Sequence, residues 1–322
     1  MRVLFMGSGE FGVPTLAALA GAHEVVAVIS QPDKPAGRSR ATTPTPAAAW
    51  ALANGLELVR EGNVNTPGFI ARVAALRCEA AVVVAFGQKL SPELIASLGA
   101  RVVNLHASLL PRHRGAAPIN WAMIEGDERT GVCVIALAQR MDAGEVYASV
   151  ATPIDPLETA GELHDRLAGL GAPAVLDVLA RHARGELRGE AQDESLATRA
   201  PKLSRADGWV DFNAGAAAVR SRIHGLTPWP GVTVRWLRAG AGEARPLLIR
   251  RVEAFPELRA DAPPGTLLAD HWVATGRGAV RLIEVQAPGG KAMAIADFAR
   301  GNRMEPGDRL QGGPAIPSDP AG

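Results

Sequence analysis

The sequence contains few cysteines and few lysines. Its two cysteines, Cys78 and Cys133, lie far apart in apolar runs. We therefore expect two buried thiols and not a disulfide or a metal site. No histidines, cysteines or carboxylates are spaced like zinc ligands, so the sequence predicts no metal. Only four of the 34 basic residues are lysines, a bias that we attribute to the composition of the host.

Long apolar runs and an excess of charge of one sign are also missing. No apolar run approaches the ~18 residues expected of a membrane span, and the N-terminal segment does not resemble a secretory signal. The 34 basic residues are balanced by 33 acidic ones, and 47% of the 322 residues are hydrophobic. This composition is typical of a folded, soluble protein. We expect a cytoplasmic protein that is long enough for two domains.

Short apolar runs alternate with helical patterns through the first half of the chain. Continuous apolar strands between helices predict an α/β fold, with a Rossmann-like, mostly parallel sheet covered by helices on both faces. The predicted strands cover residues 3–6, 25–29, 80–85, 102–105, 131–138 and 145–151. The predicted helices cover residues 11–20, 46–53, 69–76, 92–97 and 161–182.

The pattern changes after a polar, unpatterned segment at residues 185–204. Beyond it, a helix over residues 214–224 precedes short strands separated by glycine, proline and charged residues, which predicts a smaller β-barrel, OB-like domain. These strands cover residues 232–237, 246–252, 265–268, 272–274 and 279–285. We therefore expect a first domain at 1–185, a linker at 186–203, a β-barrel domain at 204–303 and a disordered, Gly/Pro-rich tail at 304–322.

A glycine-rich loop follows the first predicted strand. Residues 7–12 read GSGEFG, the G-x-G-x-x-G spacing of dinucleotide-binding loops. The acidic residue that would hold the ribose should end the second strand, where this chain has Ser30, and Asp33 lies beyond it in a turn-rich loop. The loop is therefore either the cofactor site of an NAD-dependent oxidoreductase or a tight strand-to-helix turn. Quenching of nicotinamide fluorescence would distinguish the two.

The strongest candidates for catalytic residues lie in and after the strand predicted at 102–105. Asn104 and His106 alternate along the chain and so project on the same face, and Asp142 lies in the turn sequence Asp-Ala-Gly. An imidazole with an ordinary pKa near ~6.5 is a suitable base. An amide can donate to an oxyanion, and a carboxylate can orient the base or a water. A structural histidine and a surface carboxylate are the simpler interpretation. Together, however, the three residues suit transfer of a one-carbon acyl group to an amine.

A Ser–His–Asp hydrolase is the alternative on the same residues, with Ser108 as nucleophile. No G-x-S-x-G elbow occurs in the chain, so Ser108 is a poor nucleophile candidate.

The wider motifs resemble a known family. The runs NLHASLLP (104–111), GAAP (115–118) and DAG (142–144) resemble the 10-formyltetrahydrofolate-dependent formyltransferases. The run QPDKPAGR (31–38), together with Thr130-Gly-Val, Trp209 and Pro228-Trp-Pro230, resembles the members that act on a charged tRNA. The resemblance covers all but the tail.

This resemblance implies a catalytic trio of Asn104, His106 and Asp142, with 10-formyltetrahydrofolate as formyl donor and no metal. It implies methionyl initiator tRNA as the acceptor, a role in translation initiation and a protein that acts as a monomer. It also implies that the loop at 7–12 is a turn near the methionyl end of the acceptor. The folate contacts that it implies are Ser108, Leu109, Leu110, Pro111, Phe86, Gly87, Gln88 and Leu90.

Other acceptors for the same chemistry remain open. A sugar-nucleotide amine is the nearest alternative, since such enzymes also have a second domain. A glycinamide ribonucleotide enzyme would lack that domain, and water as acceptor would release formate.

The charge distribution favours a polyanionic partner for the second domain. Residues 201–303 contain 15 basic and 9 acidic residues, a net charge of about +6 in a chain whose total is only +1. The loop after residue 38 and the run QAPGGKAM (286–293) have fewer basic residues than the family pattern, which predicts a weaker electrostatic grip on tRNA. The candidate nucleic-acid contacts are Arg38, Arg40, Arg220, Arg222, Arg235, Arg250, Arg251 and Lys291.

Overall fold

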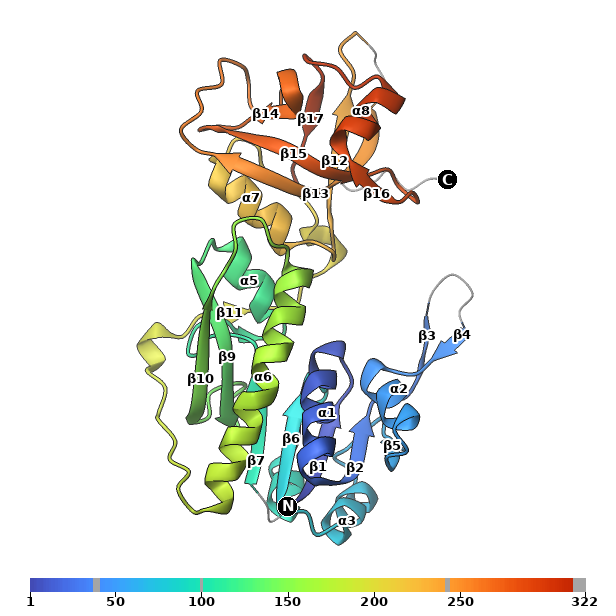
Figure 1. Ribbon diagram of the computed structural model, residues 1–322, viewed down its shortest axis with the longest axis vertical. Helices are drawn as coiled ribbons and strands as arrows, with labels where there is room; N and C mark the ends of the chain where they lie inside the picture. Colours follow the sequence, from blue (N-terminus) through green and yellow to red (C-terminus); the bar gives the residue numbers. More distant parts are fainter. Residues whose placement is uncertain (37–40, 99–100, 241–243, 315–322) are drawn as a thin grey trace. The chain divides into compact units, whose positions relative to one another are not determined.

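The computed structural model describes residues 1–36, 41–98, 101–240 and 244–314 (Figure 1). The chain forms two compact units. The first comprises Met1–Gly115, Gly131–Thr152 and His164–Arg199, and the second comprises Ala116–Thr130, Pro153–Leu163 and Ala200–Gly322. The units do not follow the single boundary near residue 185 that the sequence predicts, because two short segments of the N-terminal half group with the C-terminal part.

The first unit is built on a seven-stranded sheet with the strand order β10-β9-β7-β6-β1-β2-β5. Neighbouring strands from β5 to β7 are parallel, and β9 is antiparallel to β7. This confirms the predicted Rossmann-like, mostly parallel sheet. The strands are β1 (Arg2–Gly7), β2 (Glu24–Ser30), β5 (Leu58–Arg60), β6 (Ala80–Val84), β7 (Arg101–His106), β9 (Arg129–Ala136) and β10 (Val146–Pro153). Short pairs outside it are β3 (Lys34–Ala36) with β4 (Ala41–Thr43), and β8 (Arg114–Gly115) with β11 (Arg199–Ala200).

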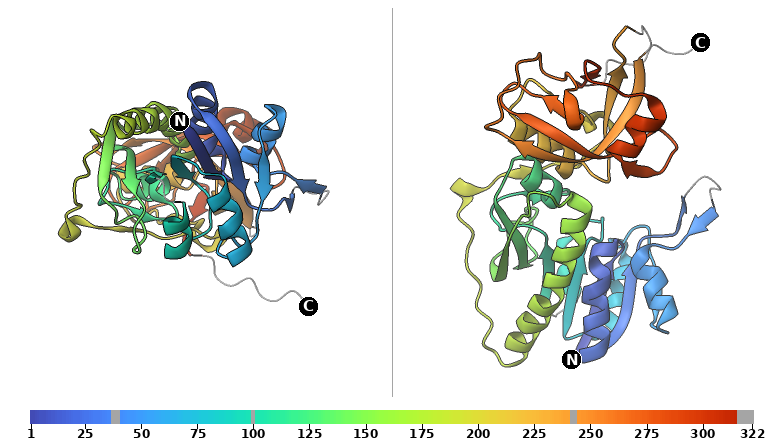
Figure 2. Two further views of the ribbon diagram at one scale, coloured as in Figure 1. Left: turned by 90° about the horizontal axis from the view of Figure 1, so that it is seen from below. Right: turned by 45° about the horizontal axis from the view of Figure 1, so that its top comes forward.

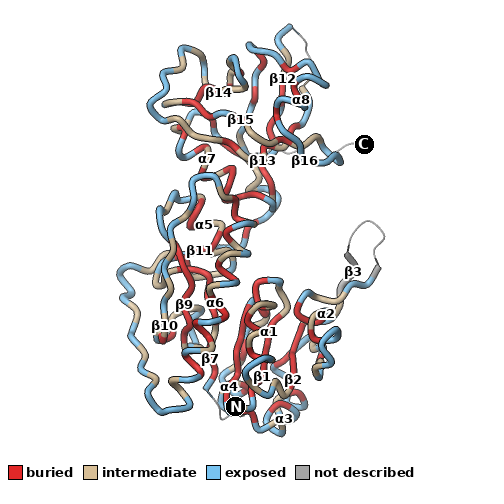
Figure 3. Tube along the Cα trace, in the orientation of Figure 1, coloured by how far each residue is buried: buried red, intermediate tan, exposed pale blue. Residues whose placement is uncertain are grey.

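Helices cover both faces of this sheet. Figure 2 (left) shows α1 and α6 on one side of the strands and the helices α3 and α4 on the other. The side chains of Leu4 and Met6 pack in one buried cluster with Phe69 of α3 and Leu94 of α4, and Figure 3 shows the central strands as the most buried part of the unit. The helices are α1 (Val13–Ala22), α2 (Pro46–Ala53), α3 (Pro67–Ala75), α4 (Pro92–Ser97) and α6 (Ala160–Ala183), with short 3-10 turns η1 (Glu10–Gly12) and η2 (Glu194–Leu196).

Three of these helices begin at the same local signal. A hydroxyl residue is followed directly by proline at the starts of α2, α3 and α4, and in each case the hydroxyl oxygen accepts a hydrogen bond from the backbone N–H three residues later. The hydroxyl satisfies one of the unpaired donors at the helix start, and proline already has the helical φ. Residues 46–53 and 92–97 are therefore helical as predicted.

The strand order places the candidate site. β1 and β6 are neighbours in the sheet, although β2 and β5 lie between them in the chain. The connections from β1 and from β6 therefore leave in opposite directions, and ligands of such sheets bind at the carboxyl ends of the strands at this switch point. The loops after β1, β6 and β7 all leave from that edge.

The second unit contains an antiparallel, barrel-like sheet with the order β14-β15-β13-β12-β17, and β16 also pairs with β15. This confirms the predicted smaller β-barrel. Its elements are α5 (Pro118–Ile124), η3 (Arg205–Asp207), α7 (Ala216–Gly225), β12 (Val232–Leu237), β13 (Ala244–Phe255), η4 (Ala269–His271), β14 (Trp272–Ala274), β15 (Ala279–Gln286), β16 (Ala292–Ala294), α8 (Ile295–Asn302) and β17 (Arg309–Gln311). The strand predicted at 265–268 is present only as two isolated bridges.

Residues 304–314, part of the expected disordered tail at 304–322, form ordered structure, and the rest of that call lies outside the described residues. β17 pairs with β12, and Leu310 is buried in the core of the second unit. The side chain of Asp308 is also buried, and it accepts hydrogen bonds from Trp236 Nε1 at 2.8 Å and from the backbone N–H of Ala239 at 2.9 Å and of Glu305 at 3.2 Å. Glycine and proline in this segment form turns around a short strand, which composition alone does not reveal.

The structure also bears on the cysteines and on membrane-spanning segments. Cys78 and Cys133 are both buried free thiols, as predicted. No helix among the described residues is long and apolar enough to cross a membrane.

We expect Asp308→Ala to lower the free energy of unfolding by about 1–3 kcal/mol, because it leaves the buried Nε1 donor of Trp236 and the backbone N–H groups of Ala239 and Glu305 without their acceptor. Urea unfolding followed by tryptophan fluorescence measures this. Asp297→Ala is the control, since Asp297 forms an exposed ion pair with Arg300 and the substitution should change stability by less than about 0.5 kcal/mol. Equal effects of the two substitutions would contradict the structural role of residues 304–314.

Candidate active site

His106 ends β7, and its side chain is only 6% exposed. Its Nε2 atom lies 2.9 Å from the backbone carbonyl oxygen of His113. A carbonyl can only accept, so Nε2 must carry a proton and donate it. In the neutral ring, Nδ1 therefore keeps its lone pair and is the basic atom.

Asp142 faces that basic atom. Its Oδ2 lies 3.7 Å from His106 Nδ1, and the carboxylate is 14% exposed. This distance is too long for a direct hydrogen bond, and Oδ2 instead accepts from the backbone N–H of Gly115 at 2.9 Å. An amine N–H placed beside both atoms could donate to either of them, so the pair is arranged to receive a proton.

Burial and nearby charges set the protonation state of His106. Burial lowers its pKa, the Asp142 carboxylate and the His113 carbonyl raise it, and the charges of His113 and Arg114 lower it again. The net effect is a pKa below the usual value. The ring is therefore neutral near pH 7, which is the form that a general base requires.

The turn between β9 and β10 positions Asp142. Asp142 itself has a φ of 55°, and a Cβ on Gly144 would lie 1.8 Å from the carbonyl oxygen of Ala136. Only glycine fits at residue 144. The Asp-Ala-Gly sequence is thus a turn, as predicted, but its carboxylate points toward His106 and not into solvent.

Asn104 is half-buried on β7, two residues before His106. Side chains two residues apart on a strand lie on the same face, so the structure keeps the predicted pair together. Among the described residues, the Asn104 side chain has no hydrogen-bond partner, and its amide N–H groups are available to a ligand.

The residues after His106 form a tight turn. Ser108 is fully buried, and its hydroxyl donates to the carbonyl oxygen of Arg112 at 2.7 Å. The hydroxyl therefore braces the turn, which agrees with its rejection as a nucleophile. Leu109, Leu110 and Pro111 follow it and are half-buried.

The loop after β6 contains the other predicted folate contacts. The side chains of Phe86 and Leu90 belong to the buried cluster that packs under α3 and α4. The amide of Gln88 accepts from Val64 N at 3.2 Å and donates to Glu61 O at 2.7 Å. These three side chains are thus engaged with the protein itself. Gly87 is exposed with a φ of 77°, and a Cβ at this position would lie 2.4 Å from Gln31 Nε2.

The glycine-rich loop lacks the features of a dinucleotide site. The hydroxyl of Ser30 is buried and bonds to Ser8 Oγ at 3.4 Å and to Thr45 Oγ1 at 2.6 Å, so β2 ends on a structural contact. The carboxylate of Asp33 forms an ion pair with Arg60 at 2.8 Å. A Cβ on Gly7 would approach the Val84 carbonyl to 2.7 Å. The glycines therefore permit close packing of a tight turn.

Three of the predicted nucleic-acid contacts are occupied by other interactions within the second unit. Arg222 stacks on the ring of Trp209 at 4.0 Å and donates to its carbonyl, and Arg250 contacts Gln286 at 3.1 Å. Arg251 forms an ion pair with Glu162 at 2.6 Å. Burial raises the pKa of Glu162, but hydrogen bonds from Arg251 and from Thr159 outweigh it and lower the pKa to about 2.

The remaining predicted contacts differ in exposure. Arg235 and Lys291 are exposed and have no side-chain partner among the described residues. Arg220 is half-buried, and burial lowers its pKa. Arg38 and Arg40 lie outside the described residues.

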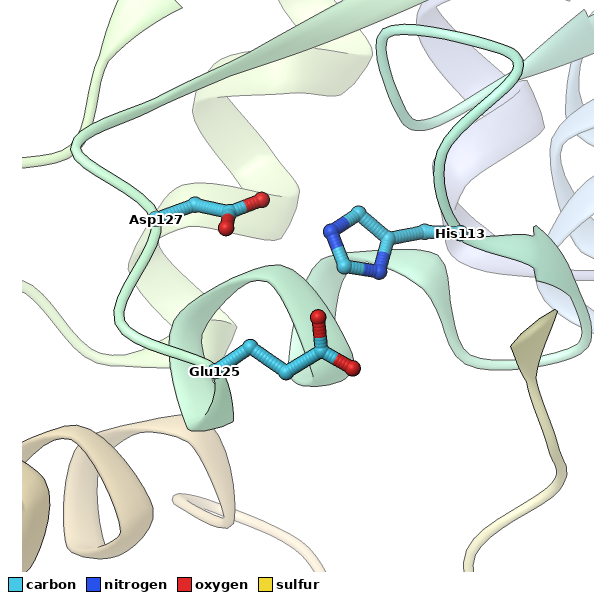
Figure 4. Close-up of side chains that lie close together, drawn as sticks. All are labelled: His113, Glu125 and Asp127. Atoms are coloured by element: carbon cyan, nitrogen blue, oxygen red, sulfur yellow. The ribbon is translucent and has the colours of Figure 1, made fainter. Parts of the chain in front are cut away.

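Candidate metal ligands are few. One candidate set consists of a histidine and two carboxylates, the side chains of His113, Glu125 and Asp127 (Figure 4). His113 belongs to the first unit, and the other two belong to the second. Within either unit alone, the described residues include no set of three such donors.

Sequence reasoning missed the segment at residues 190–198, which it treated as linker. Gln192 donates to the carbonyl oxygens of Asp142 and Gly144, and Thr198 accepts from the backbone N–H of His113. The segment therefore contacts both sides of the candidate site. A polar stretch without periodicity has no sequence signal for such contacts.

Comparison with known proteins gives one consistent result. Residues 1–179 match the family model described as formyl transferase, and residues 202–303 match the formyl transferase C-terminal domain. The chain is 40% identical to methionyl-tRNA formyltransferase of Heliobacterium modesticaldum, covering 96% of this chain and all of the relative. It is 38% identical to the protein of the same name from Solibacter usitatus, covering 96% and 98%.

Solved structures share the fold at low identity. HypX from Aquifex aeolicus in complex with tetrahydrofolic acid has a TM-score of 0.59 at 18% identity, covering 93% of this chain and 47% of HypX. An N-formyltransferase from Helicobacter canadensis, in complex with folinic acid and dTDP-3-aminofucose, has a TM-score of 0.65 at 12% identity, covering 88% and 99%. At these identities the likeness extends to the fold alone.

We expect Asp142→Asn to lower the pKa of His106 further, because the substitution removes the negative charge that raises it. An NMR titration of the His106 ring measures the shift, and the nitrogen chemical shifts should report a proton on Nε2 in both proteins. Asp193→Asn, at an exposed carboxylate of the same unit, is the control. A pKa that rises or stays constant in Asp142→Asn would contradict the assigned geometry.

Proposed function

This chain belongs to the formyl transferase family, and from that premise we propose how its residues perform the reaction. The protein transfers the formyl group of 10-formyltetrahydrofolate to the α-amino group of methionyl initiator tRNA, for translation initiation. The observation that carries the proposed mechanism is the buried His106, whose Nε2 lies beside the His113 carbonyl and whose Nδ1 faces the Asp142 carboxylate.

The proton of the attacking amine goes to His106. The amine attacks as the neutral form, and a bond forms between its nitrogen and the formyl carbon. His106 Nδ1 accepts the proton that this nitrogen loses, and the carboxylate of Asp142 stabilises the resulting imidazolium. The same proton then goes to the folate nitrogen when its bond to the formyl carbon breaks.

Asn104 stabilises the charge that develops on the formyl oxygen. Its unpartnered amide N–H groups lie on the same face of β7 as His106 and can donate to the oxyanion. A rigid strand fixes both side chains, so little reorganisation is needed during the reaction.

The formyl donor is proposed to bind at the carboxyl edge of the sheet, beside the loop after β6 and the turn after β7. Because Phe86, Gln88 and Leu90 contact the protein itself, we expect them to shape this loop. The exposed Gly87 and the backbone around it would then meet the pterin ring. Leu109, Leu110 and Pro111 are retained as the contacts on the other side. The buried Ser108, whose hydroxyl donates to the Arg112 carbonyl, would shape that turn.

Exposed basic residues of the second unit are proposed to contact the tRNA backbone. Arg235 and Lys291 are the best placed of the predicted set because they have no competing partner in the described chain. Arg222, Arg250 and Arg251 are engaged within the protein, and we assign them a structural role. Arg38 and Arg40 remain predicted contacts.

A single chain supplies all three proposed catalytic residues. Asn104, His106 and Asp142 all belong to the first unit of a single chain, so no partner subunit has to complete the site. We therefore propose a monomer that works in the cytoplasm, where its tRNA substrate is charged. Light scattering at assay concentration tests the oligomeric state.

A direct assay of the acceptor tests the reaction. Labelled formyl groups from 10-formyltetrahydrofolate should appear on methionyl initiator tRNA. Uncharged tRNA and an aminosugar nucleotide should accept little. Transfer to the aminosugar alone would support the alternative acceptor, and release of formate alone would support hydrolysis.

We expect His106→Ala to lower kcat by about 10²–10⁴-fold, since it removes the base, and Asn104→Ala by about 10²–10³-fold, since it removes the oxyanion donor. Single-turnover formylation measures both effects, and circular dichroism should show that the fold is retained. Near-normal turnover in a folded variant would refute the role of that residue.

Arg235→Ala should weaken tRNA binding. It should also reduce the slope of log Kd against log salt by about 1, the contribution of one phosphate contact. Filter binding at several salt concentrations measures this. Arg259→Ala is the matched control, an exposed arginine of the same unit outside the predicted set. If the two variants bind tRNA with the same salt dependence, Arg235 is not a phosphate contact.

A further inference from the structure

The side chain of Gln192 uses all of its polar atoms at the candidate active site. Its Nε2 donates to the carbonyl oxygen of Asp142 at 2.8 Å and to that of Gly144 at 2.7 Å. Its Oε1 accepts from Arg114, from Nε at 3.1 Å and from Nη2 at 2.7 Å. The amide therefore joins the Asp-Ala-Gly turn to the opposite strand β8.

Arg114 connects this amide to the groups that hold the catalytic side chains. The residue after it, Gly115, donates its backbone N–H to Asp142 Oδ2. The residue before it, His113, offers the carbonyl that accepts from His106 Nε2. A shift of Arg114 would therefore move the backbone partner of the carboxylate and that of the imidazole together.

The rest of the segment fixes Arg114 and its neighbour in place. Glu194 accepts from both terminal nitrogens of Arg114 at 3.0 Å, and the Arg114 side chain is only 9% exposed. Thr198 Oγ1 accepts from the backbone N–H of His113 at 2.8 Å, and its carbonyl accepts from the N–H of Arg114 at 2.9 Å.

The other end of the segment is tied to the strand that follows the Asp142 turn. The backbone of Glu190 exchanges two hydrogen bonds with Val146, of 2.8 and 3.0 Å. Residues 190–198 thus span from β10 to the turn after β7, and Gln192 lies between these attachments.

We propose that Gln192 is a positioning residue, and that the segment 190–198 is a strap that sets the distance between His106 and Asp142. This inference rests on the proposed function of that pair. Gln192 touches no reacting atom, and it acts through the backbone of Asp142 and through Arg114. Its two donors match two carbonyls of one turn, an arrangement that a hydrocarbon side chain cannot replace.

The substitution Gln192→Leu tests this role, because it is neutral and of similar size but has no hydrogen-bonding atoms. We expect kcat to fall by about 10- to 100-fold, as a misplaced catalytic pair predicts. The KM for 10-formyltetrahydrofolate and for methionyl tRNA should change by less than about 3-fold, since the substrate contacts are unaltered.

The titration of His106 provides a second readout that does not depend on activity. The charged groups that face the ring are Asp142, His113 and Arg114. Of these, Asp142 raises the pKa, so a looser Asp142 turn should lower the pKa of His106. The acid limb of the kcat profile should move to lower pH by the same amount.

Ser195→Ala is the matched control, a neutral change in the same segment that removes a hydroxyl donating to Asp193. If Gln192→Leu resembles Ser195→Ala in kcat and in the His106 titration, the proposal is overturned. A fall in kcat without a change in that titration would also overturn it, because it indicates a merely structural role.

Thr198→Val keeps the test decisive if Gln192→Leu does not fold. This isosteric change removes the acceptor of the His113 N–H, and the His113 carbonyl raises the pKa of His106 through its hydrogen bond. The pKa should therefore fall here as well, and an unchanged pKa would overturn the strap. A wild-type protein that does not formylate methionyl tRNA would instead refute the proposed function and leave these titrations interpretable.

Discussion

The hydrogen bond from His106 Nε2 to the carbonyl oxygen of His113 is the interaction on which the candidate site depends. It assigns the proton to Nε2 and so makes Nδ1 the basic atom, on the side where Asp142 lies. Without it, the ring could rotate or change tautomer, and burial would leave a neutral histidine with no defined direction. A backbone carbonyl is a suitable partner because it cannot donate and carries no charge that titrates.

The pairing of His106 with Asp142 requires the turn after β7 and the turn after β9 to hold a common geometry. Strand β7 supplies Asn104 and His106 on one face, and the neighbouring strand β9 leads into the turn of Asp142. The sheet alone does not set the distance between the two turns. The hydrogen bonds of Arg114 and Gln192 do, because they connect the backbone on both sides. The mechanism thus relies on polar contacts outside the sheet, and such contacts leave no periodic pattern in the sequence.

In the second unit, some basic side chains are engaged in contacts within the protein, and others are exposed and available to a ligand. A count of basic residues treats every arginine alike, whereas the structure shows Arg222 stacked on Trp209 and Arg251 paired with Glu162. Such arginines have exchanged hydration for contacts within the protein, so they would have to break these contacts to bind a phosphate. Arg235 and Lys291 need no such exchange, and they are the better expectation for a polyanionic partner.

The sequence by itself determined the alternating strands and helices, and it placed Asn104 and His106 on one face of a strand. These follow from local propensity and from the regular alternation of side chains along a strand, which need no distant contact. Only the tertiary structure decided that residues 304–314 complete a sheet, that Phe86 and Leu90 pack into the core, and that Gln192 supports the Asp142 turn. Each of these depends on residues far apart in the chain, and hydrogen bonds between such residues leave no periodic trace in composition or spacing.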